Sequence, residues 1–255
     1  MDNQVIINNL LVSYSESGNG AMALLFLHGW RSNKEVWVQV IKNLSIINNQ
    51  LSIIAIDLPG FGSSQMPSEP MTVGDYAEVV KGLIEKLELK NVILVGHSFG
   101  GRVGIKLASQ NPNLISKLVL VDSAGFAMDS GKKSAIALVA KIAKPFFKPK
   151  IMQGLRKGIY KAIGAEDYLA TPELQKTFVN IVSEDLTEDM RRISVPTLIV
   201  WGNADKETPV EFLYKMKSLI PNTKYQILSN AGHFSFLDNP EEFAQALLAF
   251  FSPRH

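Results

Sequence analysis

The chain of 255 residues contains no cysteine. It can therefore form no disulfide, no cysteine nucleophile and no cysteine-ligated zinc or iron–sulfur site. It also lacks an apolar stretch close to the ~20 residues that a membrane-spanning helix needs. Residues 1–10 have neither the basic segment nor the long apolar segment of a signal peptide. These absences predict a cytoplasmic protein without a transmembrane segment.

An excess of charge of one sign is also lacking. The 26 Lys and Arg residues nearly balance the 24 Asp and Glu residues, so the net charge is only +2, and no overall field predicts nucleic-acid binding. Histidine is scarce, with four residues, and no spacing of His, Asp and Glu suits a metal site. We expect neither a metal nor a cofactor. A hydrophobic content of 46% and a charged content of 20% are ordinary for a globular protein with one large α/β domain.

Short strand-like runs alternate with helical patterns along most of the chain. Residues 5–7 and 10–14 are β-rich and flank Asn8-Asn9, which predicts a hairpin. Further strands are predicted at 23–27, 52–56, 92–95, 116–121, 196–201 and 224–228. Helices are predicted at 33–44, 72–87, 210–219 and 241–251. This alternation is typical of a mostly parallel sheet with helices on both faces.

The alternation is interrupted between residues 124 and 192, which carry helical patterning and no clear strand. We interpret this interval as a helical cap inserted into the sheet domain. The predicted division is a core of residues 1–123 and 193–255, and a cap of residues 124–192.

The strand at 92–95 leads into Gly96-His97-Ser98-Phe99-Gly100, and a helical pattern follows. A Gly-x-Ser-x-Gly between a strand and a helix predicts a nucleophile elbow, a sharp turn that exposes the serine hydroxyl. Gly96 and Gly100 suit this turn, because the strand and helix backbones nearly touch there. Ser98 is therefore the candidate nucleophile.

A serine hydroxyl needs a base to take its proton and a third group to orient that base. His233 is the candidate base, because it lies in a loop after the last predicted strand. His255 is the last residue, while His28 and His97 adjoin strand ends, where we interpret both, with Asp57, as holding loops by hydrogen bonds.

Two aspartates are candidates for the third group. Asp205 follows the strand at 196–201, and Asp122 follows the strand at 116–121. We favour Asp205, because Ser98, Asp205 and His233 then follow the chain order of known serine hydrolases. Asp122 stays the alternative acid.

Five motifs occur in one order along the chain: His28-Gly29-Trp30, Asp57-x-Pro-Gly-x-Gly-x-Ser, Gly96-His97-Ser98-Phe99-Gly100-Gly101, Trp201-Gly202-x-x-Asp205 and Gly232-His233. With these motifs the chain resembles α/β-hydrolases of the carboxylesterase type, over essentially all of its length outside the cap. The resemblance implies an α/β-hydrolase fold and an oxyanion hole made by the backbone N–H groups of Trp30 and Phe99. A helix N-terminus at Phe99 would favour a developing oxyanion.

Serine at the nucleophile position favours acyl transfer and argues against the dehalogenases and epoxide hydrolases of this fold, which begin with an aspartate. We expect a serine hydrolase that cleaves a small-molecule carboxylic ester through an acyl-enzyme. One alternative is hydrolysis of a carbon–carbon bond by the same triad, which an arginine such as Arg156 in the cap would favour. A second alternative is a ligand receptor with slow turnover.

The predicted cap is strongly basic, with nine Lys and Arg residues and one Asp between residues 129 and 162. We interpret it either as a solvated face above an apolar one or as a docking surface for something acidic. His28-Gly29-Trp30 and the following residues to Trp37 resemble the pimeloyl-acyl-carrier-protein methyl ester carboxylesterases, which suggests an acyl chain on an acidic carrier. Contact with an anionic membrane surface is the other candidate.

Overall fold

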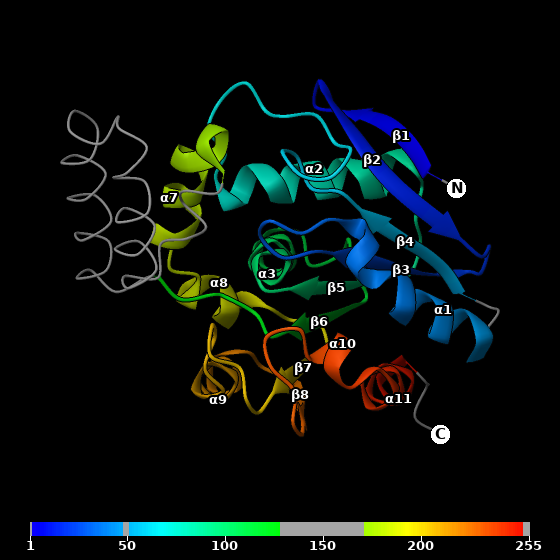
Figure 1. Cartoon of the computed structure of the whole chain (residues 1–255), viewed down its shortest axis with the longest axis vertical. Coiled ribbons are helices and arrows are strands. Elements are labelled where there is room, and N and C mark those ends of the chain that lie inside the picture. The colour runs from blue at the N-terminus through cyan, green and yellow to red at the C-terminus, as the bar shows by residue number, and fades with distance from the viewer. Residues whose placement is uncertain (1, 48–50, 128–170, 252–255) are drawn as a thin grey trace, which may run out of the picture.

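The structure is a computed structural model that describes residues 2–47, 51–127 and 171–251 (Figure 1). Its described part contains one eight-stranded sheet in the order β1-β2-β4-β3-β5-β6-β7-β8. The strands are β1 (Asp2–Ile7), β2 (Leu10–Ser17), β3 (Met22–Leu27), β4 (Leu51–Ile56), β5 (Ile93–His97), β6 (Lys117–Val121), β7 (Thr197–Gly202) and β8 (Thr223–Leu228). Every predicted strand is present.

The sheet is mostly parallel, as the alternation of strands and helices predicts. Only the pairs β1–β2 and β2–β4 are antiparallel; the pairs from β4 to β8 are parallel. The predicted hairpin joins β1 to β2, and its turn residues Asn8 and Asn9 both have positive φ, 50° and 63°. This backbone conformation is typical of two-residue hairpin turns and suits asparagine.

Helices cover both faces of the sheet (Figure 1). They are η1 (Lys34–Trp37), α1 (Val38–Ile47), α2 (Val73–Lys86), α3 (Phe99–Gln110), η2 (Pro172–Leu174), α7 (Gln175–Ser183), α8 (Thr187–Arg192), α9 (Glu211–Leu219), α10 (Ser235–Asp238) and α11 (Pro240–Phe251). The predicted helix at 33–44 consists of a 3-10 turn followed by α1. Thr72, the first residue of the helix predicted at 72–87, caps α2 in a capping box with Asp75.

Strand alternation divides the core into two clusters, one on each face of the sheet. Leu25, Leu27 and Leu94 face the cluster that includes α2, α3 and α9. Leu24 and Phe26 face the other cluster, with α1, α10 and α11. Because successive side chains point to opposite faces, strands that are buried on both sides consist of continuous apolar residues.

Between β6 and β7 the described residues hold η2, α7 and α8 and no strand. The side chain of Arg102, on α3, is buried and donates to the carbonyls of Phe126, Ile181 and Glu184. Lys106, one turn further along α3, pairs with Glu184 and Asp189, both at 2.9 Å. These contacts attach the described part of the interval to the sheet domain.

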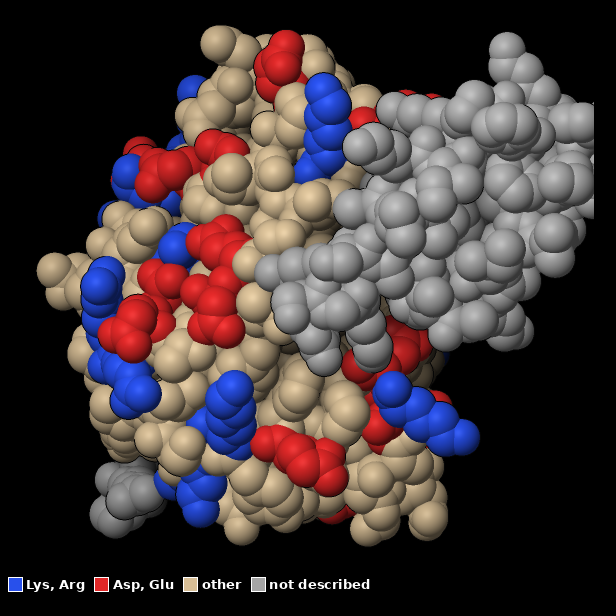
Figure 2. Space-filling model, turned by 90° about the vertical axis from the view of Figure 1, so that its left-hand side faces the viewer, with Lys and Arg blue, Asp and Glu red and all other residues tan. Residues whose placement is uncertain are grey.

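The remainder of the predicted cap lies outside the described residues. This includes the basic stretch at 129–162 and Arg156, so the division at residues 124 and 192 stays a prediction. On the described part of the face shown in Figure 2, acidic and basic side chains are intermixed. No helix among the described residues is long and apolar enough to cross a membrane.

Candidate active site

The predicted strand–turn–helix around Ser98 is present. Strand β5 ends at His97, α3 begins at Phe99, and Ser98 between them has φ 50° and ψ −109°, a strained conformation for a residue with a side chain. The two flanking glycines are needed for space. A Cβ on Gly96 would lie 2.4 Å from the carbonyl oxygen of Gly100, and a Cβ on Gly100 would lie 2.5 Å from that of Leu27.

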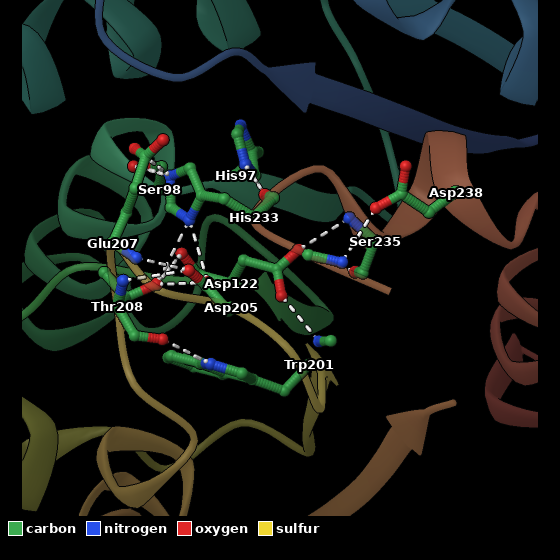
Figure 3. Close-up of polar contacts among 12 residues, drawn as sticks. His97, Ser98, Asp122, Trp201, Asp205, Glu207, Thr208, His233, Ser235 and Asp238 are labelled. Atoms are coloured by element: carbon green, nitrogen blue, oxygen red, sulfur yellow. Dashed lines mark hydrogen bonds and ion pairs between the residues drawn. The ribbon is translucent and has the colours of Figure 1, made fainter. Parts of the chain in front are cut away.

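The structure brings Ser98, His233 and Asp205 together (Figure 3). The Nε2 atom of His233 lies 3.0 Å from Ser98 Oγ, and its Nδ1 atom lies 2.8 Å from Asp205 Oδ2. With its proton on Nδ1, the His233 ring donates to the carboxylate, and the lone pair of Nε2 is free to accept the serine proton. The geometry is that of a nucleophile, a general base and a group that orients the base.

Asp205 is held by the loop that follows it. Its Oδ1 accepts from the N–H groups of Glu207 and Thr208 at 2.8 and 3.0 Å. Its Oδ2 accepts from the Thr208 hydroxyl at 2.7 Å. Burial raises the pKa of Asp205, but the hydrogen bond and charge of His233 and the donors from Thr208 outweigh it and lower the pKa overall. Asp205 is therefore an ionised acceptor.

The surroundings of His233 act in the opposite direction on its pKa. Burial lowers the pKa of His233, whereas the hydrogen bond to Asp205 and the charges of Asp205, Glu207 and Asp122 raise it, and the net shift is upward. A hydrogen bond from His97 holds the loop of His233, because His97 Nε2–H donates to the carbonyl of His233 at 2.7 Å. Burial, and then the nearby His233, lower the pKa of His97 to about 3, so its ring is neutral.

Asp122, the alternative acid, makes different contacts. Its Oδ1 accepts from the N–H of Gly202 at 2.8 Å. Its Oδ2 accepts from the N–H and the hydroxyl of Ser235, at 3.1 and 2.6 Å. These bonds join the ends of β6 and β7 to the start of α10. Burial raises the pKa of Asp122 to about 7, although the bonds from Ser235 and Gly202 oppose the shift.

Two residues beside Asp205 were not singled out from the sequence. Thr208 Oγ1 lies 2.7 Å from Asp205 Oδ2, 3.2 Å from His233 Nδ1 and 3.1 Å from the carbonyl of Asp122. Glu207 places its Oε2 atom 3.4 Å from His233 Nε2. The only feature of the sequence that could have indicated them is their position two and three residues after Asp205. In a turn that follows an aspartate, the next residues commonly fold back onto its carboxylate.

The two backbone N–H groups expected to form an oxyanion hole belong to segments that lie beside Ser98. Phe99 is the first residue of α3, where a helix leaves N–H groups without an intrahelical partner. A Cβ on Gly29 would lie 3.3 Å from Ser98 Cβ, so the backbone that leads into Trp30 passes close to the serine. The role of the two N–H groups stays a prediction.

An aromatic cluster adjoins this side of the site. The ring of Trp30 contacts those of Phe61, Phe99 and Phe178, with centroids 4.9, 5.4 and 5.3 Å apart. Tyr76 packs edge-on against Phe99 at 4.9 Å. Aromatic side chains are thus contributed by α2, α3, α7 and the loops after β3 and β4.

The structural roles predicted for His28 and Asp57 are confirmed. His28 is buried, donates from Nδ1 to the carbonyl of Gly29 at 2.7 Å and accepts at Nε2 from the N–H of Leu58 at 3.0 Å. Asp57 forms a buried ion pair with Lys34 at 2.9 Å and also accepts from the N–H of Ser63. Both side chains hold the loops that follow β3 and β4.

No cluster of three or more His, Asp or Glu side chains in the described ranges could hold a metal ion. The chemistry that the site can perform with its own groups is proton transfer from Ser98 to His233 followed by nucleophilic attack.

Comparison with known proteins agrees with the fold. Residues 24–246 match the model of the alpha/beta hydrolase family, and the chain belongs to that family. The resemblance found in the motifs is therefore confirmed at the level of the superfamily, as is the α/β-hydrolase fold.

Relatives and solved structures in the family include several kinds of hydrolase. The chain is 27% identical to an uncharacterized hydrolase, YugF of Bacillus subtilis, over 96% of this chain and 95% of the relative. It is 29% identical to a 2-hydroxy-6-oxo-6-(2'-aminophenyl)hexa-2,4-dienoic acid hydrolase of Metapseudomonas resinovorans, over 94% and 87% of the two chains. The crystal structure of a bacterial membrane phospholipase A superposes with a TM-score of 0.78 at 26% identity, covering 98% of this chain and 85% of the other.

Proposed function

We propose that this hydrolase cleaves carboxylic esters of small molecules through an acyl-enzyme on Ser98. The observation that carries the proposal is the pair of contacts from His233, 3.0 Å to Ser98 Oγ and 2.8 Å to Asp205 Oδ2. His233 takes the serine proton as Oγ attacks the ester carbonyl, and the N–H groups of Trp30 and Phe99 receive the oxyanion. The proton on Nε2 then passes to the leaving alcohol, and water hydrolyses the acyl-enzyme.

The aromatic cluster of Trp30, Phe61, Phe99 and Phe178 supports an apolar acyl or alcohol group. Aromatic side chains near the nucleophile bury apolar substrate surface. A membrane phospholipase A among the similar structures is consistent with ester chemistry on this fold.

Carbon–carbon bond hydrolysis is a second candidate, because the dienoic acid hydrolase is among the more similar relatives. The same nucleophile and base serve both reactions, so the substrate must decide. An acyl carrier or a membrane surface as partner also stays a proposal, since the basic stretch at 129–162 lies outside the described residues.

The experiment compares wild type with Ser98→Ala on p-nitrophenyl esters from acetate to laurate and on a 2-hydroxy-6-oxo-dienoate. We expect steady turnover of an ester by wild type and loss of at least about 10³-fold in the variant, because the nucleophile is removed. Faster cleavage of the dienoate than of every ester would favour the carbon–carbon reaction. A single burst without turnover would instead favour a ligand receptor.

A further inference from the structure

Glu207 is an acidic side chain beside the candidate base. Its Oε2 atom lies 3.4 Å from His233 Nε2, the same nitrogen that lies 3.0 Å from Ser98 Oγ (Figure 3). The Glu207 side chain is 67% exposed, so it stands at a solvent-accessible side of His233. The proposed chemistry does not use this carboxylate.

The backbone that carries Glu207 is fixed. The N–H groups of Glu207 and Thr208 both donate to Asp205 Oδ1, at 2.8 and 3.0 Å. The carbonyl of Thr208 accepts from the buried indole N–H of Trp201 at 2.8 Å. These bonds fix the backbone of the short segment, and the Glu207 side chain extends from it towards His233.

The position of Glu207 relative to Nε2 determines which part of a substrate it meets. In ester cleavage Nε2 gives its proton to the leaving oxygen, so that oxygen must come within hydrogen-bond reach of Nε2. The group attached to the leaving oxygen then lies next to Glu207. In the proposed mechanism the oxyanion, in contrast, faces the backbone N–H groups of Trp30 and Phe99.

We propose that Glu207 is a specificity-determining residue that favours esters whose leaving alcohol carries a positive charge close to the scissile oxygen. This inference rests on the proposed ester hydrolysis. A cation at this position gains attraction from the carboxylate, and a leaving group with a carboxylate is repelled by it. Amino alcohols and quaternary ammonium alcohols with a two-carbon spacer are the chemical class that fits.

The test uses butyrylcholine and its uncharged carbon isostere, 3,3-dimethylbutyl butyrate. Wild type, Glu207→Gln and the control Glu85→Gln are assayed on both esters at low salt. Glu85 is exposed in the last turn of α2. The chain then leads to the start of β5, at the edge of the sheet opposite Ser98. Glu85→Gln changes the net charge by the same amount as Glu207→Gln. The ratio of kcat/KM for the two esters cancels any general effect of Glu207 on the base.

We expect Glu207→Gln to lower the charged-to-neutral ratio of kcat/KM about fivefold, as for one charge pair near water, and Glu85→Gln to leave it unchanged. The difference between wild type and Glu207→Gln should shrink with added salt. An unchanged ratio in Glu207→Gln, with both esters still turned over in a Ser98-dependent reaction, would overturn the inference and leave the proposed function standing. If wild type cleaves neither of these two esters and none of the p-nitrophenyl esters, the proposed function is contradicted, and the inference with it.

Discussion

At the scale of single residues, the site depends on one hydroxyl shared between several partners. Thr208 Oγ1 has one proton but two acceptors within reach, Asp205 Oδ2 at 2.7 Å and the carbonyl of Asp122 at 3.1 Å. It can also accept from His233 Nδ1 at 3.2 Å. In the proposed mechanism Thr208 is thus a positioning residue for both the acid and the base.

Replacing Thr208 with valine keeps the shape and removes these bonds. We expect kcat/KM for a neutral ester to fall about tenfold or more, because a hydrogen bond to a charged group contributes about 1.5–3 kcal/mol. Thr208→Ser should recover most of the activity. The pH profile separates positioning from structure: loss of a donor to Asp205 should move the limbs of the profile, whereas a purely structural effect would lower the rate equally at all pH values.

The pH dependence of the wild-type rate follows from the raised pKa of His233. Protonated His233 cannot accept the proton of Ser98, so kcat/KM should fall as the pH decreases through a pKa above the ordinary value of about 6.5. Glu207→Gln removes one of the charges that raise this pKa and should move the acid limb to lower pH. The measurement is kcat/KM for a neutral ester from about pH 5 to about pH 9. An acid limb that moves to higher pH in Glu207→Gln would contradict this account of the electrostatics.

At the scale of elements, the site is assembled from loops at the ends of neighbouring strands. Ser98 follows β5, Asp122 follows β6, Asp205 follows β7 and His233 follows β8. Because the carboxyl ends of parallel strands meet at one edge of the sheet, the sequence was sufficient to predict that these side chains come close together. Chain order favoured Asp205 over Asp122, but both follow buried strands, and it is the loop conformation that places Asp205 Oδ2 2.8 Å from His233 Nδ1.

The two aspartates should respond differently to replacement. Asp205→Asn removes the acceptor that fixes the tautomer of His233 and should lower kcat about 10⁴-fold. Asp122→Ala leaves three donors without their acceptor and should lower the free energy of unfolding by about 3 kcal/mol or more, with a smaller effect on kcat. Urea unfolding and ester turnover of both variants are the measurements. A 10⁴-fold loss of kcat in a folded Asp122→Ala, with Asp205→Asn active, would make Asp122 the acid.

The short elements show where sequence patterns are weakest. Helix α10 has four residues and no amphipathic repeat, so no periodicity could predict it. The positions of Thr208 and Glu207 depend on the turn after Asp205, and one sequence of turn-forming residues is compatible with several conformations. Elements with long, regular patterns, such as α2 with its capping box, were predicted closely.

At the scale of the whole molecule, the fold could be predicted because the apolar runs, the helical patterns and the glycines at the turn all indicate the same fold. Continuous apolar runs such as β3 supply both core clusters at once, and helical patterns separate the parallel strands. The glycines on either side of Ser98 permit the close approach of α3 to β3 and β5. Substrate choice is less predictable, because it depends on single side chains such as Glu207 and on loops outside the regular elements.

The most direct test of the central claim is to identify the acylated residue. Wild type and Ser98→Ala are mixed with a p-nitrophenyl ester, quenched in acid within the burst, and digested for peptide mass spectrometry. The account predicts one acyl group per chain, attached to Ser98, and none in the variant. Acylation of another residue at the same rate in both proteins, or ester turnover that persists in Ser98→Ala, would contradict it.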